Sequence, residues 1–301
     1  MSTGSTTGTS PPSSFTEIER SWRPEPIVQH ATIERRPAAD LAALLDQRCP
    51  LESTGDPLPP LWHWTLFPPL HLSSELDEDG HPRDGALTPP LPDRRRMFGG
   101  GRLHIRSPLR LGDEVERRES VRSVRTATGS SGPLLLVTVA HDLLVDGELR
   151  LHEEQDFVYR RAADVAAAGA RSATAPDPVE IADRPWQLEL ASNPVTLFRF
   201  SAVTGNAHRI HYDRQYATEV EGHPGLVVHG PLLAILMLEL PRRHHAAPVV
   251  ELTWRGRRPV HEHDEVVATG RPIEAGAKLA AGTPTDPDRF HATVRFDETP
   301  S

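Results

Sequence analysis

Apolar and polar positions alternate along three stretches in the first half of the chain, at residues 115–127, 134–147 and 148–160. Glycine-bearing breaks separate these stretches, and alternation with such breaks is typical of consecutive antiparallel strands. Residues 264–282 and 288–298 repeat the scheme in shorter form in the second half. The pattern therefore predicts that each half ends in a curled antiparallel sheet.

A weak internal repeat relates the two halves. The segment RSPLRLGDEV at residues 106–115 matches RRPVHEHDEV at residues 257–266, about half the chain later. Both contain an arginine, a proline two residues on, an apolar residue, and then Asp-Glu-Val where an extended run begins. A repeat of this kind indicates one structural unit that is used twice.

Each half also contains a candidate helix before its sheet. The segment Pro37–Gln47 begins with proline, which suits a first helical turn, and its apolar residues recur at helical spacing. The segment His229–Leu240 is apolar almost all round. It is therefore expected to be buried on every side, as a helix wrapped by a sheet would be.

Two changes of composition divide the chain. Residues 1–14 are small and polar and predict a disordered tail. Alanine, glycine and proline dominate the stretch around residues 161–183, which predicts a linker. We therefore expect one domain at residues 15–160 and a second at residues 184–301.

Charge and cysteine content limit the classes of function. The formal net charge is -9, with 33 basic and 42 acidic residues and no basic block, so a nucleic-acid partner is not expected. The single cysteine, Cys49, cannot form an intramolecular disulfide, which favours a reducing compartment. Neither a membrane span nor a signal peptide is recognisable. We expect a soluble, cytoplasmic protein without a membrane partner.

Reactive side chains are densest between Phe200 and Ala234, in FSAVTGNAHRIHYDRQYATEVEGHPGLVVHGPLLA. The spacing of Gly205, Asn206, His208 and His211, followed by a His-Gly pair that opens a helix, resembles the signature of the MaoC-like, hydratase-2-type hot-dog family. In that signature a catalytic aspartate stands at the position of Asn206, and Asn-Pro stands at the positions of His208 and Arg209. His211 matches the catalytic histidine of the family.

The variant HRIHYD with PGLVVHGPLLA is similar to one branch of the family, the double hot-dog proteins related to mesaconyl-C4-CoA hydratase and mitochondrial-type 3-hydroxyacyl-thioester dehydratase. The segments LWHWTLFPPLHLSSELDEDGHP and RRRMFGGGRLHIRSPL resemble the first, non-catalytic hot-dog of that branch. The resemblance implies an α+β double hot-dog, in which two antiparallel sheets are joined edge to edge and each wraps around a long central helix.

Water addition to an enoyl thioester needs a base for water, a proton for the α-carbon, and donors for the thioester oxygen. His211 suits the acid and base roles because imidazole titrates near neutral pH. Asn206 exchanges no proton, but its amide can position the water or the hydroxyl. The backbone N–H of Gly230, at a helix amino terminus, can polarise the thioester carbonyl. Four further residues are candidates for substrate binding: His208, Arg209, Tyr212 and His229. The resemblance places His229 with Gly230 at the thioester carbonyl, and Arg209 could pair with a carboxylate or phosphate.

These features favour a hydro-lyase that acts on a C4-dicarboxylyl-CoA such as mesaconyl-CoA or 3-methylfumaryl-CoA, with an acyl thioester as small-molecule partner and no cofactor. The alternatives are an (R)-3-hydroxyacyl-thioester dehydratase of fatty-acid or polyketide metabolism, an acyl-CoA thioesterase, and a non-catalytic acyl-thioester-binding protein. Asn206 speaks against the thioesterase, which normally needs a carboxylate. A homodimer is an open expectation because hot-dog sheets often pair.

Other groups of residues have structural interpretations that compete with a functional one. A metal site is not expected, because no carboxylate or thiolate recurs at ligand spacing near the histidines at 208, 211, 223 and 229. The glycines at 99–101 lack a phosphate-loop context and indicate a tight bend. The arginines at 94–96 suit a solvated face or a basic cluster beside a pocket equally well. The aromatic residues Trp62, Trp64 and Phe67 suit the core as well as a substrate wall.

Overall fold

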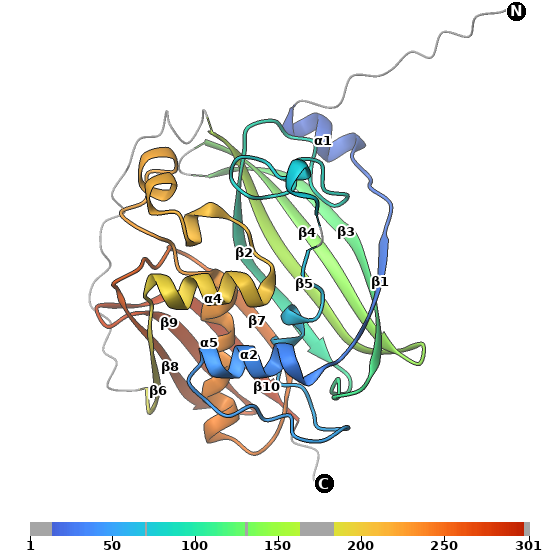
Figure 1. Ribbon diagram of the computed structural model, residues 1–301, viewed down its shortest axis with the longest axis vertical. Coiled ribbons are helices and arrows are strands. Elements are labelled where there is room, and N and C mark those ends of the chain that lie inside the picture. Colours follow the sequence, from blue (N-terminus) through green and yellow to red (C-terminus); the bar gives the residue numbers. More distant parts are fainter. Residues whose placement is uncertain (1–13, 70, 130–131, 163–183, 298–301) are drawn as a thin grey trace, which may run out of the picture.

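A single ten-stranded antiparallel sheet organises the computed structural model of the chain, which describes residues 14–69, 71–129, 132–162 and 184–297. The strand order is β1-β3-β4-β5-β2-β7-β10-β9-β8-β6, so five strands from each half of the chain form each half of the sheet (Figure 1). The bounds in the first half are Ile27–Thr32 (β1), Arg94–Ile105 (β2), Glu114–Gly129 (β3), Gly132–Val145 (β4) and Glu148–Arg161 (β5). Those in the second half are Trp186–Ala191 (β6), Val249–Gly256 (β7), Glu265–Ile273 (β8), Gly276–Thr283 (β9) and Asp286–Phe296 (β10).

The two halves are joined edge to edge where β2 pairs with β7, from Gly100 opposite Arg255 to His104 opposite Glu251. Reading outward from this junction, β2, β5, β4, β3 and β1 correspond to β7, β10, β9, β8 and β6. The predicted meanders are confirmed, since β3, β4 and β5 pair consecutively, as do β8, β9 and β10. The chain therefore builds the same half-sheet twice.

The internal repeat is confirmed at the level of single hydrogen bonds. The backbone N–H groups of Arg106 and Ser107 both donate to the carbonyl of Arg150, and those of Arg257 and Arg258 both donate to the carbonyl of Arg289. In the first copy the N–H of residue 110 donates to the carboxylate of residue 113 at 2.8 Å, and in the second the N–H of residue 261 donates to that of residue 264 at 3.0 Å. The two segments fold into the same turn before the same strand.

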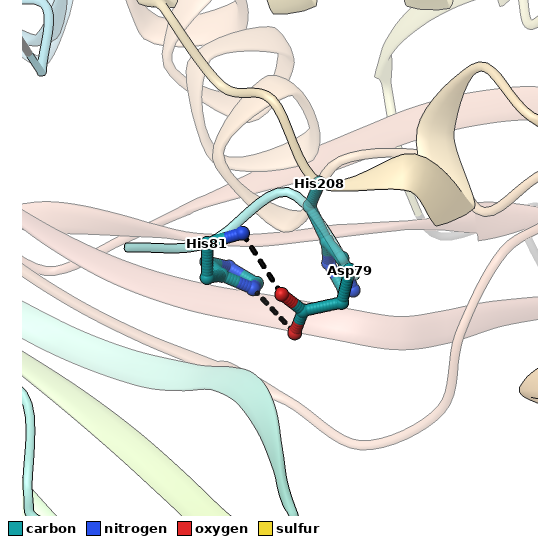
Figure 2. A group of neighbouring side chains, drawn as sticks. All are labelled: Asp79, His81 and His208. Carbon is teal, nitrogen blue, oxygen red and sulfur yellow. Dashed lines mark hydrogen bonds and ion pairs between the residues drawn. The ribbon is translucent and has the colours of Figure 1, made fainter. Parts of the chain in front are cut away.

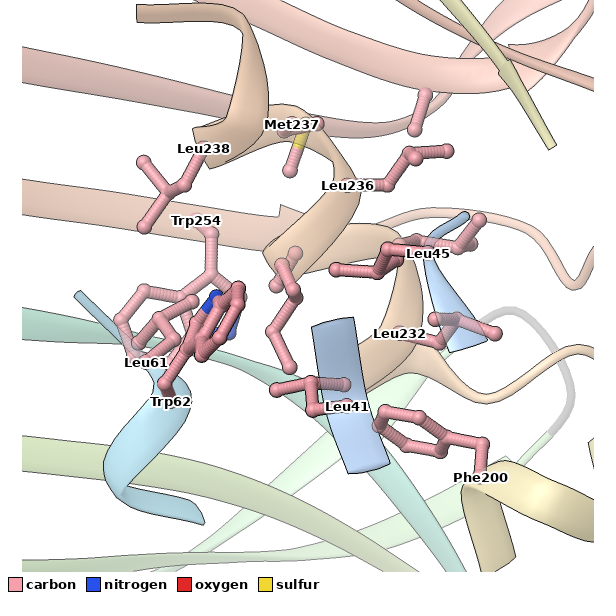
Figure 3. Packing of buried hydrophobic residues seen from close by; sticks show 14 of the residues in the cluster. Leu41, Leu45, Leu61, Trp62, Phe200, Leu232, Leu236, Met237, Leu238 and Trp254 are labelled. Atoms are coloured by element: carbon pink, nitrogen blue, oxygen red, sulfur yellow. The ribbon is translucent and has the colours of Figure 1, made fainter. Parts of the chain in front are cut away.

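The predicted helix of the second half is confirmed as α5 (Gly230–His244). Every residue from 232 to 241 is buried, because α5 packs against β6, β7, β8, β9 and β10. An apolar helix surface can be satisfied on all sides only when a sheet curls around it. Figure 3 shows Leu232, Leu236, Met237 and Leu238 of this helix in the same core cluster as Trp62 and Trp254.

The expectation of a long central helix in the first half is wrong. The helix α2 (Arg35–Leu44) forms there, but it packs against α4 (Pro194–Thr204) and the short helix η1 (Trp62–Thr65) rather than inside its own half-sheet. It follows β1 as α4 follows β6, so α2 is the counterpart of α4. Leu41 and Leu45 reach the side of α5 in the core (Figure 3). Within the described residues, nothing in the first half corresponds to α5.

The glycines at 99–101 do not form a bend between elements. They lie within β2, where a β-bulge falls between Phe98 and Gly100 and where β2 begins to pair with β7 as well as β5. A Cβ atom at Gly101 would collide with the indole of Trp254. The glycines therefore let the backbone of β2 approach a large side chain at the junction of the two half-sheets.

The remaining helices among the described residues are short. They are α1 (Phe15–Ser21), η2 (Ser73–Glu75), η3 (Arg209–His211) and η4 (Tyr216–Val220). None of the helices in the described ranges is long and apolar enough to cross a membrane. The predicted tail, apart from residue 14, and the predicted linker from residue 163 on lie outside the described residues. Both stay predictions.

Candidate active site

The predicted site lies on the segment that follows α4. Asn193 caps the start of this helix by accepting a hydrogen bond from the Thr196 N–H at 3.0 Å, and Gly205 ends it with φ 64°. The chain then turns through Asn206 into η3, which presents His211. Helix capping at both ends therefore fixes where the histidine-bearing loop begins.

His211 is held in the form required of a base. Its Nδ1 donates to the carbonyl of Val227 at 2.7 Å, so Nε2 is the ring nitrogen left to accept a proton. Burial is the largest cause that lowers the pKa of His211 to about 3, and the neighbouring His208 contributes to the same shift, so the ring is neutral at physiological pH. The side chain lines a large cavity. It is the best placed general base among the predicted residues.

His229 supports His211 from behind. The two rings stack with their centroids 3.6 Å apart, and His229 Nε2 hydrogen-bonds Ser201 Oγ at 2.9 Å. His229 is fully buried and does not line the cavity. The structure therefore places it as a support for His211 rather than on the cavity surface where the sequence placed a substrate contact.

Gly230 occupies the first position of α5, directly after His229. It lines the cavity, and a Cβ atom here would lie 3.0 Å from Cδ1 of Phe98 on β2. The first amides of a helix have no intrahelical acceptor and carry a partial positive charge. An oxygen bound here would therefore meet a hydrogen-bond donor close to His211 and to the junction of the half-sheets.

Asn206 and His208 also line the cavity. The Oδ1 of Asn206 accepts a hydrogen bond from the N–H of His208 at 3.0 Å, which shapes the loop and leaves the amide NH2 as a donor. The ring of His208 meets that of His211 edge on, with centroids 5.5 Å apart, and its Nε2 lies 3.6 Å from Glu221. Three predicted residues thus share one wall.

Arg209 and Tyr212 are not brought to the cavity. The guanidinium of Arg209 pairs with Asp213 at 2.7 Å and lies over the ring of Tyr216. Tyr212 is 46% exposed and donates its hydroxyl to the carbonyl of Ala207 at 3.0 Å. Both hold the loop in shape from its outer side. Their predicted contact with substrate has no support in the geometry.

A loop from the first half docks on the loop that carries His208 and His211. The carbonyl of Asp79 accepts the N–H of Arg209 at 2.9 Å. Gly80, with φ +90°, lies so close to the Ala207 carbonyl that any side chain there would collide with it. The ring of His81 then lies 4.3 Å from that of His208, centroid to centroid. The first half therefore supplies part of the site wall.

Asp79, His81 and His208 could together offer three ligand atoms within 4.8 Å of one another to a metal ion (Figure 2). Both carboxylate oxygens of Asp79 are already engaged by His81, one by its N–H at 2.9 Å and one by its Nδ1 at 3.0 Å. Burial lowers the pKa of His81 to about 4 although Asp79 opposes the shift. Asp79 and His81 therefore form a hydrogen-bonded pair beside His208. The expectation that the protein binds no metal stays a prediction.

The cavity has a volume of about 1190 Å³ and extends from His211 over the inner face of the first half-sheet. It occupies the place that a counterpart of α5 would fill. Part of its wall is a network of paired charges. Glu153, 1% exposed, accepts from His63 at 2.7 Å and from the Trp64 indole at 2.8 Å, while Glu119 pairs with Arg117 at 2.9 Å and with His141 at 3.1 Å.

Sequence reasoning missed most of this wall. Glu119, His141 and Glu153 come from three strands, and only the strand register places them side by side. One signal was present, since Glu153 and Gln155 are polar while Leu151 and Phe157, the next residues on the same face of β5, are apolar. The sequence left the location of three arginines and three aromatic residues open. The structure places four of them on the cavity wall, namely Arg95, Arg96, Trp64 and Phe67. Trp62 lies in the core, and Arg94 donates to backbone carbonyls.

The fold and the site together define the class of protein. HtdX of Mycobacterium tuberculosis aligns over 91% of this chain and 100% of its own, with a TM-score of 0.64 and 18% identity. A second protein of that organism, described as having a double hot-dog fold, aligns over 92% of this chain and 97% of its own with a TM-score of 0.56 and 14% identity. The chain is a double hot-dog protein.

Sequence comparison then identifies the family. The family described as hydroxyacyl-thioester dehydratase type 2 matches residues 61–262. Mesaconyl-C4-CoA hydratase of Chloroflexus aurantiacus is 42% identical over 257 residues, which are 85% of this chain and 89% of that protein. The chain belongs to the hydroxyacyl-thioester dehydratase type 2 family, and it is a hydro-lyase of the hydratase and dehydratase kind, as its sequence predicted.

Proposed function

We propose that this enzyme adds water to the double bond of a short C4-dicarboxylyl-CoA such as mesaconyl-C4-CoA, which is also called 3-methylfumaryl-CoA. One structural observation favours a short, polar acyl group over a long one. The inner face of the first half-sheet, where a long acyl chain would lie, carries the buried pairs of Glu153 with His63 and of Glu119 with Arg117. An alkyl chain placed against these charged groups would meet a polar wall with which it can form no hydrogen bond, whereas a short polar acyl group can.

In this proposal the thioester oxygen lies at the amino terminus of α5 and accepts a hydrogen bond from the Gly230 N–H. The Nε2 of His211 takes a proton from water as the oxygen attacks the β-carbon, and electrons move to the thioester oxygen. The imidazolium then delivers that proton to the α-carbon. The amide NH2 of Asn206 holds the attacking water. The proton is returned within one cycle, so a single histidine is sufficient.

A substrate panel tests the proposal. Purified protein is given enoyl-CoA thioesters of increasing length, with and without a terminal carboxylate, and loss of the conjugated double bond is followed by absorbance. We expect the highest kcat/KM on a C4-dicarboxylyl-CoA such as mesaconyl-C4-CoA. Faster turnover of enoyl-CoAs of eight or more carbons would contradict the proposal.

The second candidate is an (R)-3-hydroxyacyl-thioester dehydratase of fatty-acid or polyketide metabolism. It is favoured by an apolar part of the same cavity, lined by Leu87, Val139 and Phe157. The reaction is the reverse of the one above and uses the same residues. Chain-length preference separates the two candidates, and comparing CoA with acyl-carrier-protein thioesters identifies the carrier.

The proposal extends to the cellular compartment and the oligomeric state. Cys49 is a free thiol, which suits a reducing compartment such as the cytoplasm. A homodimer would not be needed to complete the sheet, since β2 and β7 already join the two hot-dog halves within one chain. Light scattering of the purified protein measures the oligomeric state directly.

A further inference from the structure

Six arginines of the described residues line the cavity, and one of them, Arg257, is exposed to solvent. The other five differ in how their charges are neutralised. Arg95 pairs with Glu221 at 3.1 Å, Arg117 with Glu119 at 2.9 Å and Arg258 with Asp286 at 2.7 Å. The guanidiniums of Arg96 and Arg160 make no ion pair or hydrogen bond among the described residues. These two are the half-buried cations of the wall that lack an anion.

Arg96 and Arg160 lie on different faces of the sheet. Arg160 is opposite Arg95 in the pairing of β2 with β5, and Arg96 is the next residue along β2, so its side chain points the other way. Arg96 shares its face with Phe98, two residues further on, and both line the cavity. Its guanidinium carbon lies 4.0 Å from the centre of the Phe157 ring. The ring face attracts a cation but leaves its hydrogen-bond donors free.

The position of Arg96 relative to the reacting atoms is set by β2. Phe98 packs at Gly230, where the thioester oxygen is placed in the proposed function. Two residues along a strand span roughly 7 Å. That distance, together with the long arginine side chain, suits the far end of an extended four-carbon acyl group whose thioester lies at Gly230. The charge of Arg96 acts inside this space, since it contributes to lowering the pKa of His81 on the same wall.

We propose that Arg96 binds the free carboxylate of the acyl group and so selects dicarboxylyl thioesters over thioesters that end in a methyl group. The inference rests on the proposed function. A guanidinium offers a planar set of donors that matches a carboxylate in a bidentate pair. A half-buried guanidinium without an anion is costly to maintain, and a substrate carboxylate would neutralise it.

The test uses pairs of thioesters that differ only in that group. Mesaconyl-C4-CoA is compared with 3-methylcrotonyl-CoA, which has a methyl in place of the free carboxylate, for turnover. Succinyl-CoA is compared with butyryl-CoA for binding, since neither has a double bond to hydrate. In Arg96→Gln we expect kcat/KM on mesaconyl-C4-CoA to fall about 10- to 100-fold, with a similar weakening of succinyl-CoA binding. Butyryl-CoA should bind the variant as it binds the unmodified enzyme.

Arg160→Gln is the matched control, because it removes the other unpaired arginine from the opposite face of the same strand pair. It should leave the ratio of succinyl-CoA to butyryl-CoA affinity unchanged. An equal loss for both ligands in Arg96→Gln would overturn the proposal and assign Arg96 to the CoA phosphates. Unchanged affinity for both ligands in Arg96→Gln would overturn it as well.

Different results would contradict the proposed substrate class and the proposed role of Arg96. If the unmodified enzyme shows no preference for mesaconyl-C4-CoA, the proposed substrate class is wrong and the role of Arg96 falls with it. If the unmodified enzyme prefers mesaconyl-C4-CoA and Arg96→Gln keeps that preference, the inference about Arg96 alone is wrong. Thermal unfolding of each variant shows whether a loss of binding reflects a loss of fold.

Discussion

The two halves of the sheet have the same strand order and different contents. The second half curls around α5, and ten consecutive residues of that helix are buried. The first half lacks such a helix among its described residues, and its inner face borders a cavity with charged walls. The same strand order can therefore enclose a packed helix or border a cavity. The packed half carries His211 and Gly230, and in the proposed function the cavity against the other half receives the ligand.

Removing the base in the packed half should have the largest effect. In His211→Ala we expect kcat/KM to fall by about 1,000-fold or more, because general acid and base contributions are typically 10²- to 10⁴-fold and a single histidine performs both. Hydration of an enoyl-CoA by the purified variant measures the loss. His30→Ala, an exposed change on β1, serves as the control and should keep full activity. Retained activity in His211→Ala would remove His211 from the mechanism.

Breaking the charged wall of the hollow half should mainly affect stability. Glu153→Ala leaves His63, the Trp64 indole and the Gln155 amide without their shared acceptor. We expect a loss of about 3 kcal/mol in the free energy of unfolding, as is usual when one partner is removed from a buried pair. Denaturant unfolding measures it. The matched change Glu148→Ala removes a carboxylate that is 75% exposed and should cost less than about 1 kcal/mol. Similar losses for the two variants would show that the wall is not energetically coupled.

The pH profile sharpens the contrast, because the base lies in the packed half. The folded pKa of His211, about 3, is below the usual value of a histidine. The ring therefore stays neutral and active as the pH falls from 8 to about 5, and kcat/KM should be level over that range. The contribution of His211 to the free energy of unfolding, in contrast, does change over this pH range. Since the unfolded chain binds the proton more readily, stability falls as the pH drops below about 6.5. A midpoint of activity near pH 6.5 would mean that another group carries the reaction.

The smallest effect is expected at Asn206. In Asn206→Asp the carboxylate can still accept the N–H of His208 and can hold water, so activity should stay within about 10-fold of the unmodified enzyme. Steady-state kinetics on the preferred enoyl-CoA measure it. Asn206→Leu, which is similar in size and has no polar atoms, is the comparison and should be the weaker enzyme. Complete loss in Asn206→Asp would show that the amide NH2 donor is indispensable.

The sequence predicted the structural features that depend on a repeated pattern or on a short continuous segment. Alternation and the repeated Asp-Glu-Val segments predicted both half-sheets, and the apolar run after Gly230 predicted α5. The error over α2 has a physical reason. Its amphipathic pattern specifies a helix with one buried face but not which partner covers that face, and here α4 and η1 do so. Loop-borne site residues such as His211 could be found from spacing, whereas Arg96, His81 and Glu153 come together only through the register of distant strands.

The β2–β7 pairing has a consequence for how the two halves can change. In a pair of identical subunits every substitution appears twice, so a helix cannot be given up in one copy and kept in the other. Here a single polypeptide carries both copies, and each position is free to vary alone. Covalent linkage thus releases the molecule from symmetry. It permits an asymmetric enzyme in which one copy carries His211 while the other, in the proposed function, is shaped to fit a particular acyl group.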